Sequence, residues 1–199
     1  MKENRIFTPP NESDNTISCA LSKSPKAVKI FLGGTIDNGD SIDWQSELIK
    51  TIEGVELARP THIYNPRRAE WPSADNHHEI DKQIDWELYH LERSNLIVMN
   101  ILADSKSPIS LMEIGLFAKE GKLMVFCPKT FYRYDNVRKV CERYSLPLYN
   151  TNNVPFIAEK VCEYIGIDDE AQRKANEELS KMADDWAKKI EAEFEQELK

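Results

Sequence analysis

The sequence predicts an α/β fold, with a Rossmann-like or flavodoxin-like parallel sheet of about five strands flanked by helices. From residue 28 onward, short apolar runs alternate with helix-length amphipathic stretches, and this alternation is typical of strands joined by crossover helices. The 199 residues, 41% of them hydrophobic, are enough for one domain with a sizeable core and appendages.

Five short apolar runs are the expected strands. They span residues 28–32, 62–65, 95–102, 123–127 and 146–149. Ligands of open α/β sheets bind at the carboxyl ends of the strands. We therefore expect the functional site among the residues that follow these runs.

Helical patterns lie between the strands, at residues 42–53, 78–93, 108–120, 134–144 and 154–165. In the second of them, Ile80, Ile84, Leu88 and Leu91 recur at the spacing of one buried helical face. The third begins with Ser107 and Pro108, a typical N-cap and first-turn pair.

The two ends of the chain differ from the domain expected over residues 27–166. Residues 1–26 are polar and lack periodicity, so we expect a flexible N-terminal arm. Residues 167–199 carry an apolar stripe at intervals of three or four and, from Asp168 on, eleven acidic and six basic residues. This pattern predicts an acidic amphipathic C-terminal helix, packed on the domain in the favoured alternative or paired with another subunit.

Composition restricts the partners and the compartment. The formal net charge of −8 argues against nucleic acid as a partner, although not against single nucleotides. No segment resembles a signal peptide or a membrane span, so we expect a cytoplasmic protein without membrane contact. Four widely spaced cysteines and the pair His77-His78 lack metal-ligand spacing, so we expect no metal and no cofactor.

Glu113 is the main catalytic candidate. It lies in residues 108–118, which are apolar at nearly every other position and predict a buried helix. A glutamate is seldom fully buried unless it is paired or has a function. The alternative is a glutamate at the helix edge that bonds to neighbouring backbone.

The helix before it supplies a second acidic candidate. Glu87 lies beside the expected core face of Ile84 and Leu91, whereas Asp85 lies further round the helix. At the start of the 108–120 helix, Ser107 and Ser110 can reach the same site as Glu113. Free N–H groups and the positive dipole end of that helix suit an anion such as phosphate.

Two further segments follow expected strands and could contact a ligand. In the first, Phe31 precedes Gly33, Gly34 and Asp37, where the glycines allow close backbone approach, although a plain turn uses the same residues. In the second, paired arginines could clamp a phosphate or carboxylate, and a tryptophan offers a face for a base, although a solvated loop is as probable. Its members are Asn65, Arg67, Arg68 and Trp71.

Taken together, these motifs resemble the nucleoside 2-deoxyribosyltransferase-like family, particularly a subgroup of bacteria and phages. The resemblance rests on FLGGTID, NPRR with a nearby Trp, WELYHLERSNLIVM and SPISLMEIGLFAKEGKLMVFCP, in matching order over about residues 28–146. It implies a Rossmann-like domain that cleaves the N-glycosidic bond of a 2′-deoxynucleoside. It also implies a homo-oligomer, a dimer or larger, whose subunits complete each other's sites.

The resemblance assigns roles to individual residues. Glu113 matches the family nucleophile, which forms a covalent deoxyribosyl ester that a second base or water then opens. Glu87 matches the acidic residue implicated in base recognition and proton transfer, with Asp85 as the other nearby acid.

Two positions depart from the transferases of the family. Phe31 stands where they carry a tyrosine, and Ser107 stands where they carry an aspartate that binds the 5′-hydroxyl. A serine at position 107 resembles the pattern of the related 2′-deoxynucleoside 5′-monophosphate N-glycosidases, in which serines bind the 5′-phosphate. The resemblance therefore supports two reactions almost equally, transfer of the sugar to a second base and hydrolysis of a monophosphate. The serine favours a nucleotide as the substrate. A non-catalytic nucleotide sensor is the alternative of another class, and an oligomerisation or decoy surface on the C-terminal helix is a weaker one.

Overall fold

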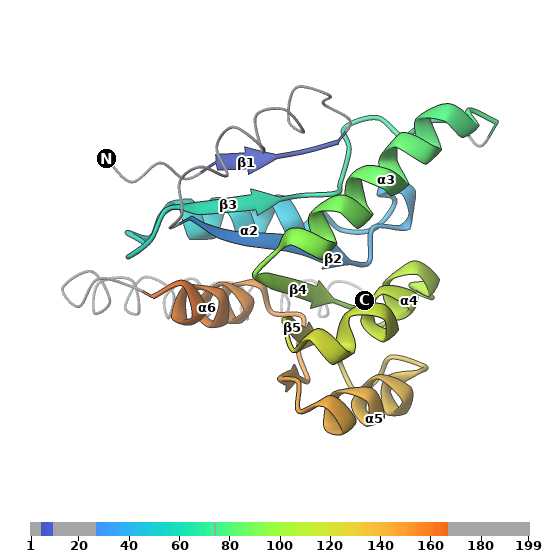
Figure 1. Ribbon diagram of the computed structural model, residues 1–199. Helices are drawn as coiled ribbons and strands as arrows, with labels where there is room; N and C mark the ends of the chain where they lie inside the picture. The colour runs from blue at the N-terminus through green and yellow to red at the C-terminus, as the bar shows by residue number, and fades with distance from the viewer. Residues whose placement is uncertain (1–4, 10–26, 74, 167–199) are drawn as a thin grey trace, which may run out of the picture. The chain divides into compact units, whose positions relative to one another are not determined.

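Six parallel strands form one sheet in the computed structural model, which describes residues 5–9, 27–73 and 75–166. Their order across the sheet is β1-β3-β2-β4-β5-β6 (Figure 1). The strands are β1 (Arg5–Phe7), β2 (Val28–Gly34), β3 (Thr61–Tyr64), β4 (Leu96–Asn100), β5 (Leu123–Phe126) and β6 (Leu148–Tyr149). Every residue of β3, β4 and β5 is buried, which explains why β4 and β5 are nearly continuous apolar runs in the sequence.

The helices begin and end within two residues of the predicted ranges, except that the third ends in a separate 3-10 turn. They are α2 (Trp44–Glu53), α3 (His77–Arg93), α4 (Pro108–Phe117), α5 (Tyr134–Tyr144) and α6 (Val154–Ile165). The 3-10 turn η2 (Ala118–Glu120) continues α4, and η1 (Asp37–Gly39) follows β2. The predicted α/β class and the five predicted strands are therefore confirmed.

Strand β1 was not predicted. It pairs with β3 through Arg5 to Phe7, inside the segment for which the sequence indicated a flexible arm. Three residues are too few for a detectable alternation, and their strand conformation depends on pairing with β3. The predicted C-terminal helix lies outside the described residues.

The described chain divides into two compact units. The first comprises residues 5–9, 27–45, 59–73 and 75–152, and it contains the whole sheet together with α3, α4 and α5. The second comprises residues 46–58 and 153–166, and it contains most of α2 and all of α6. In the second unit the Ala58 N–H donates to the Gly166 carbonyl oxygen over 2.9 Å.

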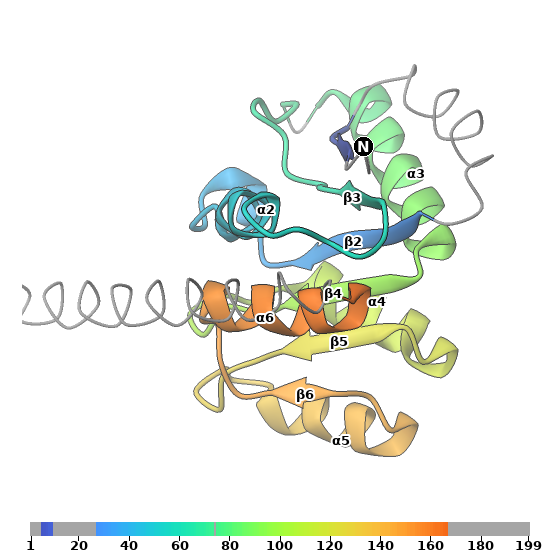
Figure 2. The ribbon, with the colours of Figure 1, turned by 90° about the vertical axis from the view of Figure 1, so that its left-hand side faces the viewer.

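The core of the first unit lies between one face of the sheet and helices α3, α4 and α5, which share one side of the strands (Figure 2). Strand side chains such as Phe31, Ile97 and Met99 meet Trp86 of α3 and Phe117 of α4 in this layer. Glu87 and Glu113 belong to α3 and α4, two of the three helices that cover this face.

The buried face of α3 differs from the predicted one. Gln83, Trp86, His90 and Leu91 are buried, whereas Ile84 is 46% exposed. The rings of Trp86 and His90 pack with Tyr64 of β3, so aromatic packing, and not the isoleucine stripe, sets how the helix is turned. The prediction that Ile84 is buried was wrong.

Other predictions concern the cysteines and the membrane. Cys127, Cys141 and Cys162 are buried free thiols, as expected from their apolar surroundings. Within the described residues no helix has both the length and the apolar character needed to span a membrane.

Candidate functional site

Glu113 lies in the second turn of α4 and is 6% exposed. Its side chain is on the buried side of the helix with Ser110, Ile114 and Phe117. No described residue donates a hydrogen bond to its carboxyl group or forms an ion pair with it. A buried carboxyl group without a partner is costly to keep ionised, which marks Glu113 as a functional candidate.

The protonation of Glu113 is coupled to that of Glu87. Burial and, as the smaller cause, the negative charge of Glu87 together raise the pKa of Glu113 to about 8. The two carboxyl groups, one from α3 and one from α4, are thus close enough for their charges to interact. This pairing brings together the two acidic residues that the sequence selected.

Glu87 is the acidic residue of α3 that faces inward. Burial raises its pKa to about 7, although a hydrogen bond from Gln83 acts in the opposite direction. The Gln83 Nε2 donates to Glu87 Oε1 over 2.6 Å. Asp85, the other acidic candidate of this helix, is exposed, so Glu87 is the one of the two that lies near Glu113 in a buried setting.

The start of α4 is built from a buried network of three hydroxyl groups. The Ser107 Oγ lies 2.6 Å from Thr35 Oγ1 and 2.7 Å from Ser105 Oγ. Thr35 Oγ1 also accepts from the Leu102 N–H, and Ser105 Oγ donates to the Leu102 carbonyl oxygen. Ser107 therefore occupies the N-cap position without capping the helix through its side chain.

The first turn of α4 has backbone N–H groups without an acceptor in the helix. Pro108 has no N–H, and the first backbone N–H groups of a helix have no acceptor within the helix. Ser110 is 4% exposed, and its hydroxyl makes no hydrogen bond to other described residues. Ser107 itself has φ 43°, a left-handed conformation that costs energy for a non-glycine residue.

Strand β2 ends with the glycine pair Gly33-Gly34, and the loop after it contains Asp37. A Cβ atom on Gly34, which has φ 133°, would lie 2.1 Å from the Asn100 carbonyl oxygen. The close approach of β4 is therefore a structural reason for glycine at position 34. The approach of a ligand that the sequence suggested stays a prediction. Asp37 is exposed and has φ 49° in the strained turn Asp37–Gly39.

The guanidinium of Arg67, expected to clamp a phosphate or carboxylate, contacts groups of the protein in this structure. Its guanidinium donates to the carbonyl oxygens of Gly39, Ser41 and Ile42 over 3.1, 2.8 and 3.0 Å. It also forms an ion pair with Asp43 at 3.3 Å. Arg67 thus fixes the loop after β2, and Asn65 fixes Arg67 by accepting its backbone N–H over 3.0 Å.

Arg68 and Trp71 keep unused donors. The Arg68 Nη2 lies 3.8 Å from a Glu79 carboxylate oxygen, while its Nη1 is buried without a hydrogen bond to the described residues. The Trp71 Nε1 is likewise buried without an acceptor in that part of the chain. Trp71 packs on the loop after β2, because a Cβ atom on Gly39 would lie 2.6 Å from Trp71 Nε1.

Phe31 and Gly33 belong to the sheet face that α3 and α4 cover. Phe31 is 1% exposed, and its ring centroid lies 6.2 Å from that of Trp86. A Cβ atom on Gly33 would approach Met99 Cε to 2.9 Å. Both residues therefore act in packing in this structure.

Three residues of the site region were not predicted, namely Gln83, Thr35 and Ser105. Thr35 had a weak signal, since it follows the glycine pair after a strand. Gln83 and Ser105 had none, because a neutral polar residue is equally common on a helix surface or in a loop. In the described ranges no three His, Cys, Asp or Glu residues group in a way that could hold a metal ion.

Comparison with known proteins adds a family. The sequence model of the family described as nucleoside 2-deoxyribosyltransferase like matches residues 27–131. Among solved structures, a conserved protein from Enterococcus faecalis V583 is similar at a TM-score of 0.40 and 14% identity, covering 78% of this chain and 99% of its own. No curated protein matches the sequence.

Proposed function

We propose that this chain, which belongs to the nucleoside 2-deoxyribosyltransferase-like family, cleaves the N-glycosidic bond of a 2′-deoxynucleoside or its 5′-monophosphate. The observation that carries the proposal is the buried carboxyl group of Glu113, which has no protein partner among the described residues and interacts with the charge of Glu87. A bound substrate would supply the partner that this buried carboxyl group lacks among the described residues.

In the proposed reaction, Glu113 is the nucleophile. An oxygen of its carboxylate bonds to the anomeric carbon of the sugar while the bond from that carbon to the base nitrogen breaks. The electron pair of the broken bond leaves with the base. The resulting deoxyribosyl ester is opened by a second base or by water, which restores the Glu113 carboxylate.

Glu87 is the proposed general acid of this reaction. Its pKa of about 7 leaves a large part of the population protonated at neutral pH, where an ordinary glutamate would have lost its proton. The proton moves to the departing base, and Glu87 becomes the carboxylate. Glu113 must be ionised to attack, so the active form carries the one proton of the pair on Glu87. Because the pKa of Glu113 is the higher of the two, this form is the less populated arrangement of that proton.

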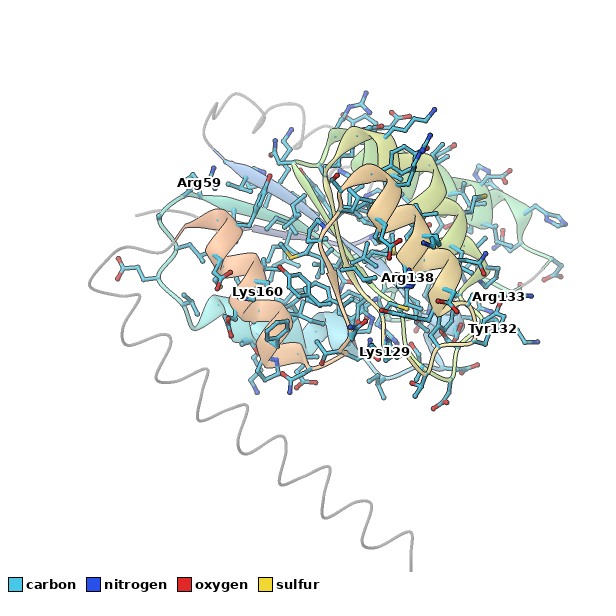
Figure 3. All side chains as sticks on the ribbon, turned by 90° about the horizontal axis from the view of Figure 1, so that it is seen from below. Arg59, Lys129, Tyr132, Arg133, Arg138 and Lys160 are labelled. Atoms are coloured by element: carbon cyan, nitrogen blue, oxygen red, sulfur yellow. The ribbon has the colours of Figure 1, made fainter. Side chains whose placement is uncertain are left out.

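A 5′-monophosphate is the favoured form of the substrate. The first turn of α4 offers unpaired N–H groups, the positive end of the helix dipole and the Ser110 hydroxyl. Lys106 lies beside this turn, and Tyr132 donates to its carbonyl oxygen over 3.4 Å. Arg133 lies next to Tyr132, with its Cζ 5.2 Å from the ring centroid (Figure 3). These cations give a local positive field on a chain whose net charge is −8.

Homo-oligomerisation is part of the proposal. Ile109, Met112 and Leu116 are 56%, 59% and 57% exposed, and their i, i+3 and i+7 spacing places them on one side of α4. Exposed apolar side chains in a row on a helix are typical of an interface. We propose that this stripe contacts a second copy of the chain, which would bring that copy next to the helix that carries Glu113.

The experiment that tests the function uses the purified full chain with deoxynucleosides and their 5′-monophosphates, each with and without an acceptor base. Base released without acceptor identifies a hydrolase, and exchange of bases identifies a transferase. Binding without turnover for every substrate would reject the enzyme and support the alternative of a nucleotide sensor.

A further inference from the structure

Gln83 lies one helical turn before Glu87 on the buried face of α3. It is 6% exposed, and its Nε2 donates two hydrogen bonds, to Glu87 Oε1 over 2.6 Å and to the Pro66 carbonyl oxygen over 3.0 Å. These two bonds use both protons of the amide nitrogen. Gln83 therefore connects Glu87 to the loop that follows β3.

The orientation of the Gln83 amide is fixed by the chemistry of its neighbours. The Pro66 carbonyl oxygen can only accept, so the amide nitrogen must face it. The opposite orientation would place the Gln83 Oε1 against two acceptors. In the orientation present, Oε1 is buried without a hydrogen bond to the described residues. Since an unpaired buried acceptor is unfavourable, the contacts of the nitrogen determine the position of this side chain.

We propose that Gln83 is the positioning residue of Glu87, holding Oε1 as a hydrogen-bond acceptor so that Oε2 carries the proton transferred to the leaving base. An oxygen that already accepts a short hydrogen bond is the less basic of the two, so the proton resides on the other one. When Oε2–H gives its proton to the base nitrogen, the electron pair of the O–H bond stays on Glu87. The Gln83 donor then stabilises the carboxylate that forms.

The catalytic meaning of this inference rests on the proposed function, whereas the hydrogen bond itself does not. Burial and Gln83 are the two influences on the pKa of Glu87, and they act in opposite directions. From α4, Glu113 is the titratable group that senses the charge of Glu87. Removing the Gln83 donor should therefore raise the pKa of Glu87, and through it alter the titration of Glu113.

A purely structural role for Gln83 gives a different expectation. If Gln83 only tied α3 to the loop after β3, replacing it would lower stability and leave the protonation of Glu87 unchanged. The discriminating variant is Gln83→Met, which retains the length of the side chain without donors. Asp81→Asn is the matched control, because it changes an exposed polar residue of the same helix.

The test is a carbon-13 NMR titration of the side-chain carboxyl groups, with the Glu87 signal assigned through Glu87→Gln. We expect Gln83→Met to shift the pKa of Glu87 upward by about one unit and Asp81→Asn to leave it unchanged. If Gln83→Met does not fold, the wild-type chain serves instead. Its Gln83 side-chain amide signals should then titrate with a midpoint at the pKa of Glu87.

An unchanged pKa of Glu87 in folded Gln83→Met, or Gln83 amide signals that do not titrate, would overturn the inference. The titration needs no substrate, so it separates this inference from the proposed function. If turnover is also found, its alkaline limb should move upward in Gln83→Met with a lower kcat, because a general acid must be protonated to act.

Discussion

At the level of single residues, the carboxyl group of Glu113 can be replaced almost without a change of shape. We expect Glu113→Gln to lower turnover by about 10³-fold or more, since an amide is a poor nucleophile. Base release from the preferred substrate measures the effect, and circular dichroism checks the fold. Glu120→Gln, which changes an exposed carboxylate just after α4, is the control. Wild-type turnover in Glu113→Gln would reject the covalent mechanism.

Ser107 provides a test of phosphate recognition. Asp tolerates the left-handed conformation that Ser107 adopts, so Ser107→Asp adds a negative charge at the start of α4 with little backbone strain. Repulsion should lower kcat/KM for a 5′-monophosphate about 10-fold more than for the free nucleoside. The ratio of the two kcat/KM values is the quantity to measure. An equal decrease for both substrates would argue against a phosphate at this position.

Some residues of the candidate site could be predicted from the sequence and others could not. Glu113 could be selected because a carboxyl group conflicts with the apolar pattern around it, and Glu87 because it lies beside a helical face that includes Leu91, which is buried. The hydroxyl network of Thr35, Ser105 and Ser107 could not be predicted. It joins the loop after β2 to the start of α4, about 70 residues further along, and only the fold brings them together.

At the level of elements, helix α4 is apolar on its exposed side as well as on its buried side. We expect Met112→Glu combined with Leu116→Glu to convert an oligomer into monomers, because two charges would be buried without partners in the interface. Light scattering after size-exclusion chromatography gives the mass. Ile42→Glu is the control, since Ile42 is 63% exposed and lies outside α4. A mass that is the same in wild type and double variant would remove α4 as the interface.

The loop after β2 depends on Arg67. Asp37, Asn38 and Gly39 have φ values of 49°, 53° and 94°. Glycine adopts such a value freely, but the two non-glycine residues are strained, and their conformation persists only if the surroundings hold it. We expect Arg67→Met to lower the free energy of unfolding by about 2 kcal/mol through loss of charge-assisted hydrogen bonds.

Arg67→Lys should rescue little of this stability, since a lysine cannot reproduce the planar set of donors. Urea denaturation measures both variants, and Arg143→Met, at an exposed position of α5, is the control. Full stability of Arg67→Met would show that the turn does not need this side chain.

The elements also show what periodicity can and cannot predict. Helix α4 was recognisable because a segment apolar on all sides has few places other than a core. The length of α3 was predictable from the sequence, but its rotation about its own axis was not. Either the face with Ile80, Ile84 and Leu88 or the face with Trp86 and His90 could have packed on the sheet. Large aromatic rings bury more area than isoleucine. Their partner Tyr64 lies on β3, so this contact is not visible in the sequence pattern of α3 alone.

At the level of the whole molecule, three buried titratable groups make stability depend on pH. Burial raises the pKa of Glu87 and Glu113 to about 7 and about 8 and lowers the pKa of His90 to about 4. The glutamates ordinarily titrate near 4.5 and histidine near 6.5. In the unfolded chain all three groups have therefore largely lost their protons above pH 6.5.

Between pH 6.5 and 8 the folded state still holds protons on the two glutamates that the unfolded state has released, so its stability must fall as the pH rises. We expect the free energy of unfolding of the full chain to decrease by about 2 kcal/mol over this range. The double variant Glu87→Gln, Glu113→Gln should abolish most of the decrease and be more stable than wild type at pH 8, because neutral amides do not lose protons. Urea denaturation at both ends of the range measures the difference, with Glu120→Gln as the exposed control. Parallel decreases in wild type and double variant would mean that these two carboxyl groups do not titrate as a buried pair.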